Sequence, residues 1–486
     1  MRRILLILLL LMTLVYAAEF RDDVLYLEIN LASGTTLQLS TGNGSIELSD
    51  ESMLFNRRIK GQFQVSVVNP EVTSVYGILN REKPEIISDD AIVAQSFAWE
   101  DDHLVLKHEL QYFYPYSFNS LDSARVFADE YGFPYSNIMA IPIVNSTLMV
   151  EDSQGQISYY ESPLRLKSTE NLIVNELPYA DEFVLEIAQG KLNLNQIVAL
   201  EEYIAGVLPN EIGPSSPLEA LKAQAVAART HAVSLLLNNR HRDQGYDLCS
   251  STHCQVYKGR HLRNENIEEA VMQTAAEILT LDGRVADATY HSSCGGKTDS
   301  SVNIWNGAPL AHLSGATCYS DAENYDLSTE KEATSWINHK LDTSDMSSWE
   351  KASISWRRNI SLATLSQNTG VKNLHSVQIL ARGNSGRILK LKLIGDNELI
   401  LDGEFKIRQA FGNLPSSFFS ILGARLQDKI MLSSSIDLAG RGSGHGVGLC
   451  QMGTLRKARA GSTYSDILQN YYPNTIIFTD WIHDEE

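Results

Sequence analysis

Apolar residues alternate with polar residues in many short segments of this chain, which is the pattern of half-buried β-strands. Clear examples are Gln62–Val68, residues 103–113 and residues 183–188. The pair Asp282-Gly283 separates two further β-prone segments and is typical of a two-residue hairpin turn. We therefore predict an α+β fold whose sheets are mostly antiparallel.

A few amphipathic segments predict helices, and the strongest of them begins at Ser216. Ser216, Pro217 and Glu219 have the spacing of a capping box, and an alanine-rich segment continues to Val233. Shorter helices are expected over residues 121–131, 265–277 and 464–469. Directly before the long helix, Glu211 is the one charged residue between positions 204 and 218.

The pattern divides the chain into a leader and three further parts. Residues 1–18 are expected to be a signal peptide, because two arginines precede an apolar segment that ends in small residues. The parts that follow are a β-rich N-terminal region (19–98), a βα subdomain (99–160) and a larger domain (161–486) with much antiparallel sheet and few helices. We expect an exported protein of the periplasm, cell envelope or extracellular space, which does not span a membrane once the leader is removed.

Composition and charge narrow the choice of partner. Hydrophobic residues make up 43% of the chain, which is ordinary for a globular protein. The formal net charge is −19, from 59 acidic and 40 basic residues. Nucleic acid is therefore excluded as the expected partner, since binding phosphates requires a basic surface.

Metal-ligating residue types gather in one polar loop. His241, Cys249, His253 and Cys254 are the types from which zinc takes four ligands. A disulfide between Cys249 and Cys254 is the alternative that export favours. Free thiols are the third possibility, and the spacing alone does not decide among the three.

Several segments resemble the stage II sporulation protein D (SpoIID/LytB) family when they are taken together and in order. The resemblance covers the chain from about residue 160 to its end and leaves residues 19–160 outside. The βα subdomain separately resembles sporulation-related repeat domains that bind peptidoglycan glycan, and an inert insertion is the alternative. The segments that carry the family resemblance are residues 202–211, 219–230, 249–259, 293–298 with Trp305, 444–453 and 467–473.

The resemblance implies a lytic transglycosylase that cleaves the MurNAc–GlcNAc β-1,4 bond of glycan strands, notably strands without stem peptides. By position, Glu211 would be the single acid/base. As an acid it protonates the glycosidic oxygen, and as a carboxylate it then takes the proton of the MurNAc 6-hydroxyl, which closes a 1,6-anhydro ring. Apolar neighbours such as Ile204, Val207, Leu208 and Ile212 would raise the pKa of this carboxyl.

The resemblance also implies the surroundings of that acid. It leads us to expect seven residues to form the binding site. Ser293 and Cys294 would line the groove, and Lys222, Gln224 and Arg229 would line it or hold its polar network. His445 and Gln451 would form hydrogen bonds with the substrate or within the active site. Some family members carry one zinc ion on the Cys/His loop beside the active site, where it would shape the groove without taking part in the reaction. Ser443, Cys450 and Met452 depart from the residues that the family more often has.

Two other functions remain open at this stage. Cys294 with His291 or His445 resembles the nucleophile and base of a thiol hydrolase. Some family members are described as enhancers of cell-wall amidases, so the chain could instead bind glycan without cutting it and modulate an amidase partner.

Overall fold

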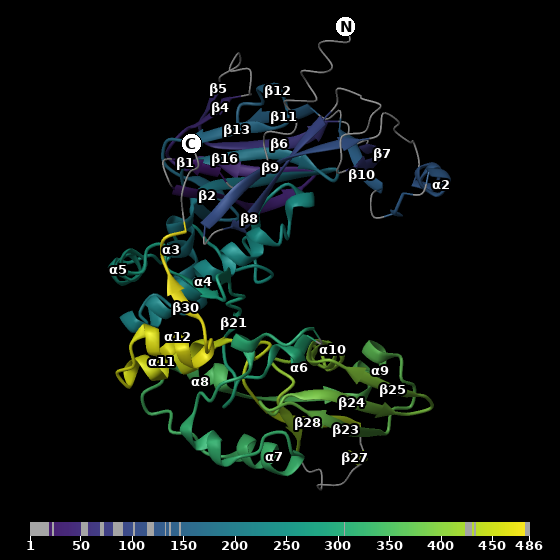
Figure 1. Cartoon of the computed structure of the whole chain (residues 1–486), viewed down its shortest axis with the longest axis vertical. Helices are drawn as coiled ribbons and strands as arrows, with labels where there is room; N and C mark the ends of the chain where they lie inside the picture. The colour runs from purple at the N-terminus through teal and green to yellow at the C-terminus, as the bar shows by residue number, and fades with distance from the viewer. Residues whose placement is uncertain are drawn as a thin grey trace. The chain divides into compact units, whose positions relative to one another are not determined.

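The computed structural model describes residues 19–21, 24–49, 57–68, 72–80, 91–100, 103–113, 121–131, 133–135, 138–144, 147–305, 307–422, 430–431 and 434–481 (Figure 1). The expected signal peptide lies outside these residues. The chain divides into two compact units. The first takes its described residues from 1–210, 232–264 and 479–486, and the second from 211–231 and 265–478.

Two antiparallel sheets form the body of the first unit. Along the larger sheet the order is β1 (Glu19–Arg21), β2 (Val24–Gly34), β17 (Lys191–Ala199), β16 (Glu182–Ala188), β13 (Leu164–Ser168), β4 (Ile46–Ser49) and β5 (Arg57–Ile59), with β18 (Leu248–Cys249) parallel to β2. The second sheet has the order β12 (Ile157–Glu161), β11 (Thr147–Asp152), β6 (Gln62–Val68), β3 (Thr36–Ser40), β14 (Leu172–Val174) and β15 (Leu177–Tyr179).

The two sheets pack face to face. β17 contacts β6, and β2 contacts β3. Strand β17 lies inside the larger sheet and is buried on both faces along most of its length, which explains its nearly continuous apolar and amide composition. In β3 and β13, by contrast, buried and more exposed residues alternate, as expected for strands with one solvated face.

Strands from distant parts of the sequence share these sheets. Residues 19–68 and 147–199 contribute to both of them, so the expected boundary at residue 160 falls inside one body. The segment between them forms a separate sheet with the helix α2 (Leu121–Tyr131), which contacts β7 and β10. Its strand order is β10 (Ile138–Val144), β7 (Val72–Asn80), β9 (His103–Phe113) and β8 (Ala91–Glu100).

Two consecutive helices follow β17, and the division between the units falls at the end of the first and within the second. Helix α3 (Leu200–Glu211) was not anticipated and ends at Glu211. Helix α4 (Leu218–Leu237) is the predicted alanine-rich helix. The expected cap at Ser216 differs, because its hydroxyl donates to the Ile212 carbonyl oxygen at 2.7 Å, while the Glu219 carboxylate binds Lys222 and the backbone of Tyr464.

The second unit contains smaller sheets around an apolar core. Leu391, Leu393, Phe411, Phe419 and Leu438 belong to this core. Its sheets are β25 (Glu398–Asp402), β24 (Ile388–Ile394), β23 (Ser376–Arg382) and β27 (Ile430–Met431); β22 (Ser355–Ser361), β28 (Ser435–Arg441) and β26 (Phe419–Ile421); β20 (Arg284–Val285), β19 (Ile278–Leu281) and β30 (Ile476–Phe478); and β21 (Tyr290–His291) with β29 (Leu449–Cys450).

Short helices connect these strands. They are α5 (Glu265–Gln273), α6 (Ser301–Trp305), η3 (Ala311–Leu313), η4 (Ser320–Asn324), α7 (Glu330–Asn338), α8 (Ser348–Ile354), α9 (Leu362–Thr369), α10 (Glu404–Ala410), α11 (Gln451–Arg459) and α12 (Tyr464–Tyr471), while η2 (Arg242–Gln244) lies in the first unit.

The predicted hairpin is confirmed as β19–β20, and both turn residues, Asp282 and Gly283, have positive φ. The α+β fold class with mostly antiparallel sheets is confirmed. In the described part of the chain, no helix is both long and apolar enough to cross a membrane.

The buried carboxyl group of Glu186 is expected to make the free energy of unfolding of the first unit depend on pH. It lies in β16 with 2% of its surface exposed, and its Oε2 has no hydrogen-bond partner among the described residues. Burial raises its pKa well above the usual value of 4.5. The unfolded chain therefore releases this proton at a lower pH than the folded chain, so stability falls as the pH rises above about 4.5.

We predict that Glu186→Gln, which is neutral at every pH, raises the melting temperature at pH 7.5 by about 2 °C or more and leaves it nearly unchanged at pH 4. Thermal melting followed by circular dichroism at both pH values measures this difference. Glu182→Gln on the same strand is the control: it removes an ion pair with Arg21 and should not stabilise the protein at pH 7.5. An equal stabilisation at both pH values would contradict the explanation.

Candidate functional site

Glu211 meets Gln451, a residue 240 positions away, within the second unit. The Gln451 Nε2 donates a hydrogen bond to Oε2 of Glu211 at 3.3 Å. Glu211 is half-buried at the end of α3, whereas Gln451 begins α11 and is 3% exposed. Of the expected site residues, these two are therefore brought into direct contact.

The turn after Glu211 is fixed by its own contacts. Ile212 is fully buried, and its carbonyl oxygen accepts the hydrogen bond from Ser216. Gly213 follows with φ +92°, and a side chain at this position would lie 3.8 Å from the ring of Trp349 on α8. The Trp349 side chain is 47% exposed. An accessible aromatic residue thus lies beside the loop of the acid, and the sequence analysis missed it because α8 is 138 residues further along the chain.

The expected binding residues on α4 are mostly interior. Gln224 and Arg229 are fully buried, and Arg229 donates through Nη1 to the Glu277 carbonyl oxygen at 2.9 Å. Lys222 is less buried; it pairs with Glu219 at 2.9 Å and lies over the Tyr464 ring. The substrate-contacting roles expected for Gln224 and Arg229 are not supported, because neither reaches solvent in this structure.

His445 is occupied by the backbone on both sides of its ring. Its Nε2 donates to the Tyr290 carbonyl oxygen at 2.9 Å, and its Nδ1 accepts from the Val447 N–H at 3.2 Å. Burial lowers the pKa of His445 well below its usual value, so the ring is neutral. The expected hydrogen bond from His445 to a substrate therefore has no free ring nitrogen. The Trp305 ring, 46% exposed, lies 5.2 Å from the His445 ring.

Ser293 and Cys294 are also fully buried, so neither lines an open groove. Burial raises the pKa of the Cys294 thiol well above its usual value, which disfavours the thiolate that a nucleophile requires. The hypothesis of a thiol hydrolase built on Cys294 gains no support from this arrangement.

Two buried charged residues that the sequence analysis missed hold the glycine-rich segments together. Arg387 donates to the carbonyl oxygens of Ser293, Cys294 and Gly444, at 3.4, 3.0 and 3.1 Å. The carboxylate of Asp299 accepts hydrogen bonds from the N–H and hydroxyl of Ser385, at 3.1 and 2.5 Å. No local motif marks these residues, since their partners lie far away in the sequence.

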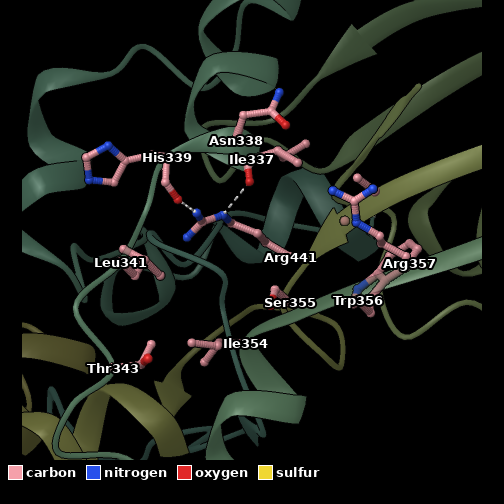
Figure 2. A pocket seen from close by; sticks show the side chains of 12 residues that line it. Ile337, Asn338, His339, Leu341, Thr343, Ile354, Ser355, Trp356, Arg357 and Arg441 are labelled. Carbon is pink, nitrogen blue, oxygen red and sulfur yellow. Dashed lines mark hydrogen bonds between the residues drawn. The ribbon is translucent and has the colours of Figure 1, made fainter. Parts of the chain in front are cut away.

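The second unit also has an open pocket of about 500 Å³, and Figure 2 shows Arg441 reaching across its wall toward two carbonyl oxygens. Arg441 donates through Nε to Ile337 at 3.3 Å and through Nη2 to His339. The described residues that line the pocket include none of those expected from the sequence to form the site. The pocket therefore adds nothing to the chemistry around Glu211.

The Cys/His loop is assembled entirely within the first unit. The ligand atoms of His241, Cys249, His253 and Cys254 all lie within 4.8 Å of one another. The separations are 3.2 Å between the two imidazole nitrogens and 3.2 to 3.9 Å between nitrogen and sulfur. Tetrahedral zinc with ordinary bond lengths requires edges of about 3.3 to 3.8 Å, so the four residues fit this ion.

Some neighbouring groups orient or ionise the ligands of the loop in a way that suits a metal ion, and one opposes it. Gln244 lies 3.3 Å from Nδ1 of His241, which leaves Nε2 directed at the thiols. A hydrogen bond with Cys254 lowers the pKa of Cys249 to about 3, which favours the thiolate form that a metal binds. Arg240 donates to Nε2 of His253 at 3.0 Å and would have to move if Nδ1 bound a metal, because Nε2 would then carry the proton.

Comparison with known proteins places two family models on the chain. Residues 188–281 match the model described as Stage II sporulation protein (SpoIID), and residues 299–448 match a domain of unknown function (DUF8618). The first match contains Glu211, helix α4 and the Cys/His loop.

Three curated relatives show the extent of the similarity. An uncharacterized protein of Brachyspira hyodysenteriae is 28% identical over 347 residues, which is 70% of this chain and 85% of the relative. The amidase enhancer of Bacillus subtilis is 27% identical over 302 residues, 56% of this chain and 40% of that protein. Stage II sporulation protein D of the same organism is 25% identical over 313 residues, 58% of this chain and 74% of the relative.

We propose that the Cys/His loop binds one Zn²⁺. Removing one thiolate should lower the affinity by at least about 10-fold, because zinc sites of this kind rely on four ligands. We expect Cys254→Ser to lose this ion in metal analysis of the dialysed protein, whereas Ser251→Ala in the same loop should retain it. Detection of a Cys249–Cys254 disulfide by mass spectrometry in the unaltered protein would contradict the proposal.

Proposed function

The chain belongs to the SpoIID family, and we propose that it is an exported lytic transglycosylase that cleaves peptidoglycan glycan strands with Glu211 as its single acid/base. The substrate is the MurNAc–GlcNAc β-1,4 linkage, in strands that have lost their stem peptides. The product carries a 1,6-anhydroMurNAc end. The family and the relative named amidase enhancer support a function related to the cell wall.

The contact between Glu211 and Gln451 is the observation on which the proposal rests. It joins a segment of the SpoIID match to a segment near the end of the chain. Glu211 also lies at the carbonyl end of α3, where the helix dipole disfavours a negative charge. The side chains of Leu208 and Ile212, its neighbours in sequence, are buried, and Glu211 itself is half-buried. The helix dipole and this partial burial favour a carboxyl group that can start the reaction as an acid.

The proposed reaction uses this carboxyl group twice. Its proton passes to the glycosidic oxygen as the bond from that oxygen to C1 of MurNAc breaks. The resulting carboxylate then takes the proton of the MurNAc 6-hydroxyl, whose oxygen forms the new bond to C1. No water is consumed, and the acid is regenerated. The N–H of Gln451 stabilises the carboxylate between the two steps through the hydrogen bond to Oε2.

Trp349 offers a binding surface next to this acid. Its exposed ring lies beside Gly213, two residues after Glu211. A flat aromatic ring provides a large apolar surface at little conformational cost, and the apolar face of a hexose ring can stack on it. We therefore assign Trp349 a role in holding the glycan near Glu211.

A second candidate function is modulation of a cell-wall amidase without glycan cleavage. The similarity to the amidase enhancer of Bacillus subtilis favours it, although the match spans 40% of that protein. The two functions predict different outcomes for the purified protein alone. A transglycosylase releases anhydro products from glycan strands, whereas a modulator releases none and alters the rate of an added amidase.

We predict that Glu211→Gln lowers the release of anhydro products from denuded glycan strands by at least about 100-fold, because general acid–base groups contribute 10²–10⁴-fold. Mass spectrometry identifies the products, since each is lighter by one water than the hydrolytic product. Glu201→Gln, in the first turn of the same helix, is the matched control and should keep its activity. Turnover retained by Glu211→Gln would refute the assignment of this acid, and an inactive parent protein would favour the modulator.

We predict that Trp349→Ala raises the KM for glycan strands by about 10-fold and changes kcat little, because lost stacking weakens substrate binding away from the reacting bond. Steady-state kinetics on strands of defined length separate these parameters. Phe405→Ala on α10, where the aromatic side chain is 63% exposed, serves as the control and should leave KM unchanged. Equal effects of the two substitutions would show that Trp349 has no specific role.

A further inference from the structure

Three buried cysteines meet inside the second unit. Cys294 follows β21, Cys318 lies before η4, and Cys450 ends β29. Their sulfur atoms all lie within 4.8 Å of one another, and their exposed fractions are 0%, 6% and 0%. Because this thiol cluster is closed to solvent, it cannot contact a glycan strand, and the proposed reaction does not use it.

Hydrogen-bond donors point at each of the three sulfur atoms. The N–H groups of Cys294 and Gly453 donate to Sγ of Cys450, at 3.2 and 3.3 Å. The N–H of Gly296 donates to Sγ of Cys294 at 3.3 Å, and the hydroxyl of Tyr471 donates to Sγ of Cys318 at 3.2 Å. Burial alone disfavours thiolates here, but these donors would stabilise sulfur atoms whose negative charge is compensated by a bound cation.

His291 supplies a nitrogen next to the thiol cluster. In the parallel pair of β21 and β29, His291 is the register partner of Cys450. The Nδ1 of His291 donates to the Val447 carbonyl oxygen at 3.0 Å. Its Nε2 is buried and has no hydrogen-bond partner within the described structure. Histidines that bind a metal through one ring nitrogen usually donate a hydrogen bond from the other to a backbone carbonyl oxygen or a carboxylate.

The presence of three sulfur atoms, and not two, favours metal binding over disulfide formation. One disulfide would consume two of the three thiols and leave the third buried beside it. Three thiolates and one imidazole instead make a complete tetrahedral ligand set for zinc. Zinc–sulfur bonds of about 2.3 Å place sulfur atoms about 3.8 Å apart, which lies within the 4.8 Å that bounds the separations in the cluster.

We propose that Cys294, Cys318 and Cys450 bind a zinc-class divalent cation in the second unit, and that the ring of His291 moves toward this ion to supply the fourth ligand. This site is separate from the Cys/His loop of the first unit, because the two share no residue. The ion would tie together three segments of the chain. Since Gln451 directly follows Cys450, the ion would also fix the residue that contacts Glu211.

The experiment uses the full-length mature protein with Cys249→Ser and Cys254→Ser, so that the three thiols of the cluster remain. Zn²⁺ alone is added after chelation, and bound metal is measured after dialysis. We expect one Zn²⁺ per chain, protection of the three thiols from alkylation, and a higher melting temperature than in the chelated protein. Replacement by Co²⁺ should give the charge-transfer absorption of a site with three thiolates.

Cys318→Ser in the same background is the test variant, because its hydroxyl can still accept the hydrogen bond from Tyr471. It should bind Zn²⁺ at least about 10-fold more weakly and lose the effect of zinc on melting. Ser292→Ala, outside the cluster, should retain both. If Cys318→Ser does not fold, alkylation and Co²⁺ spectra of the background protein decide the matter. Thiols that stay reactive in excess Zn²⁺, or a mass lower by two hydrogens that marks a disulfide, would overturn the proposal.

Discussion

The site around Glu211 depends on the hydrogen bonds that the buried guanidinium of Arg387 donates to backbone carbonyl oxygens. A charge removed from water costs several kcal/mol unless hydrogen bonds replace its hydration. Both Nη atoms of Arg387 donate to carbonyl oxygens from two segments, residues 293–294 and Gly444. These segments lie about 150 residues apart in sequence, and the guanidinium holds them together from the inside. Gln451 reaches Glu211 from the end of the second segment.

The same arrangement explains one of the glycines in the GHGVG segment. Gly446 has φ +83°, and a Cβ at this position would lie 2.2 Å from the guanidinium carbon of Arg387. Any side chain there would displace the arginine. The glycine at position 446 is therefore required by a buried cation.

Local patterns predicted the local structure well. Strand β6, helix α2 and the β19–β20 hairpin were found because alternation, helical periodicity and an Asp-Gly turn are readable within about ten residues. Helix α3 was missed because Pro209 lies inside it, and a proline in a helix interior is unusual.

The candidate site was predictable only in part, since family motifs indicate which residues gather and say nothing of which ones reach solvent. Glu211 and Gln451 were both chosen and do meet. Ser293 and Cys294 were chosen with them but are interior, because the carbonyl cage of Arg387 turns their segment inward. Arg387 and Trp349 were missed, since their neighbours in space are distant in sequence. The Cys/His loop could be predicted because its expected ligands are close in sequence. The cluster of Cys294, Cys318 and Cys450 could be recognised only in the structure, because its members are far apart in sequence.

Both ring nitrogens of His445 form hydrogen bonds with the backbone, and this affects how the charge of the segment changes with pH. Histidine is the side chain that ordinarily changes charge between pH 5 and 8. Here the backbone fixes one tautomer, and burial keeps the ring uncharged over that interval. The GHGVG segment accordingly keeps one protonation state while the medium passes from mildly acidic to neutral. The His445 ring therefore takes no part in proton transfer over this interval and acts as a structural support for the segment.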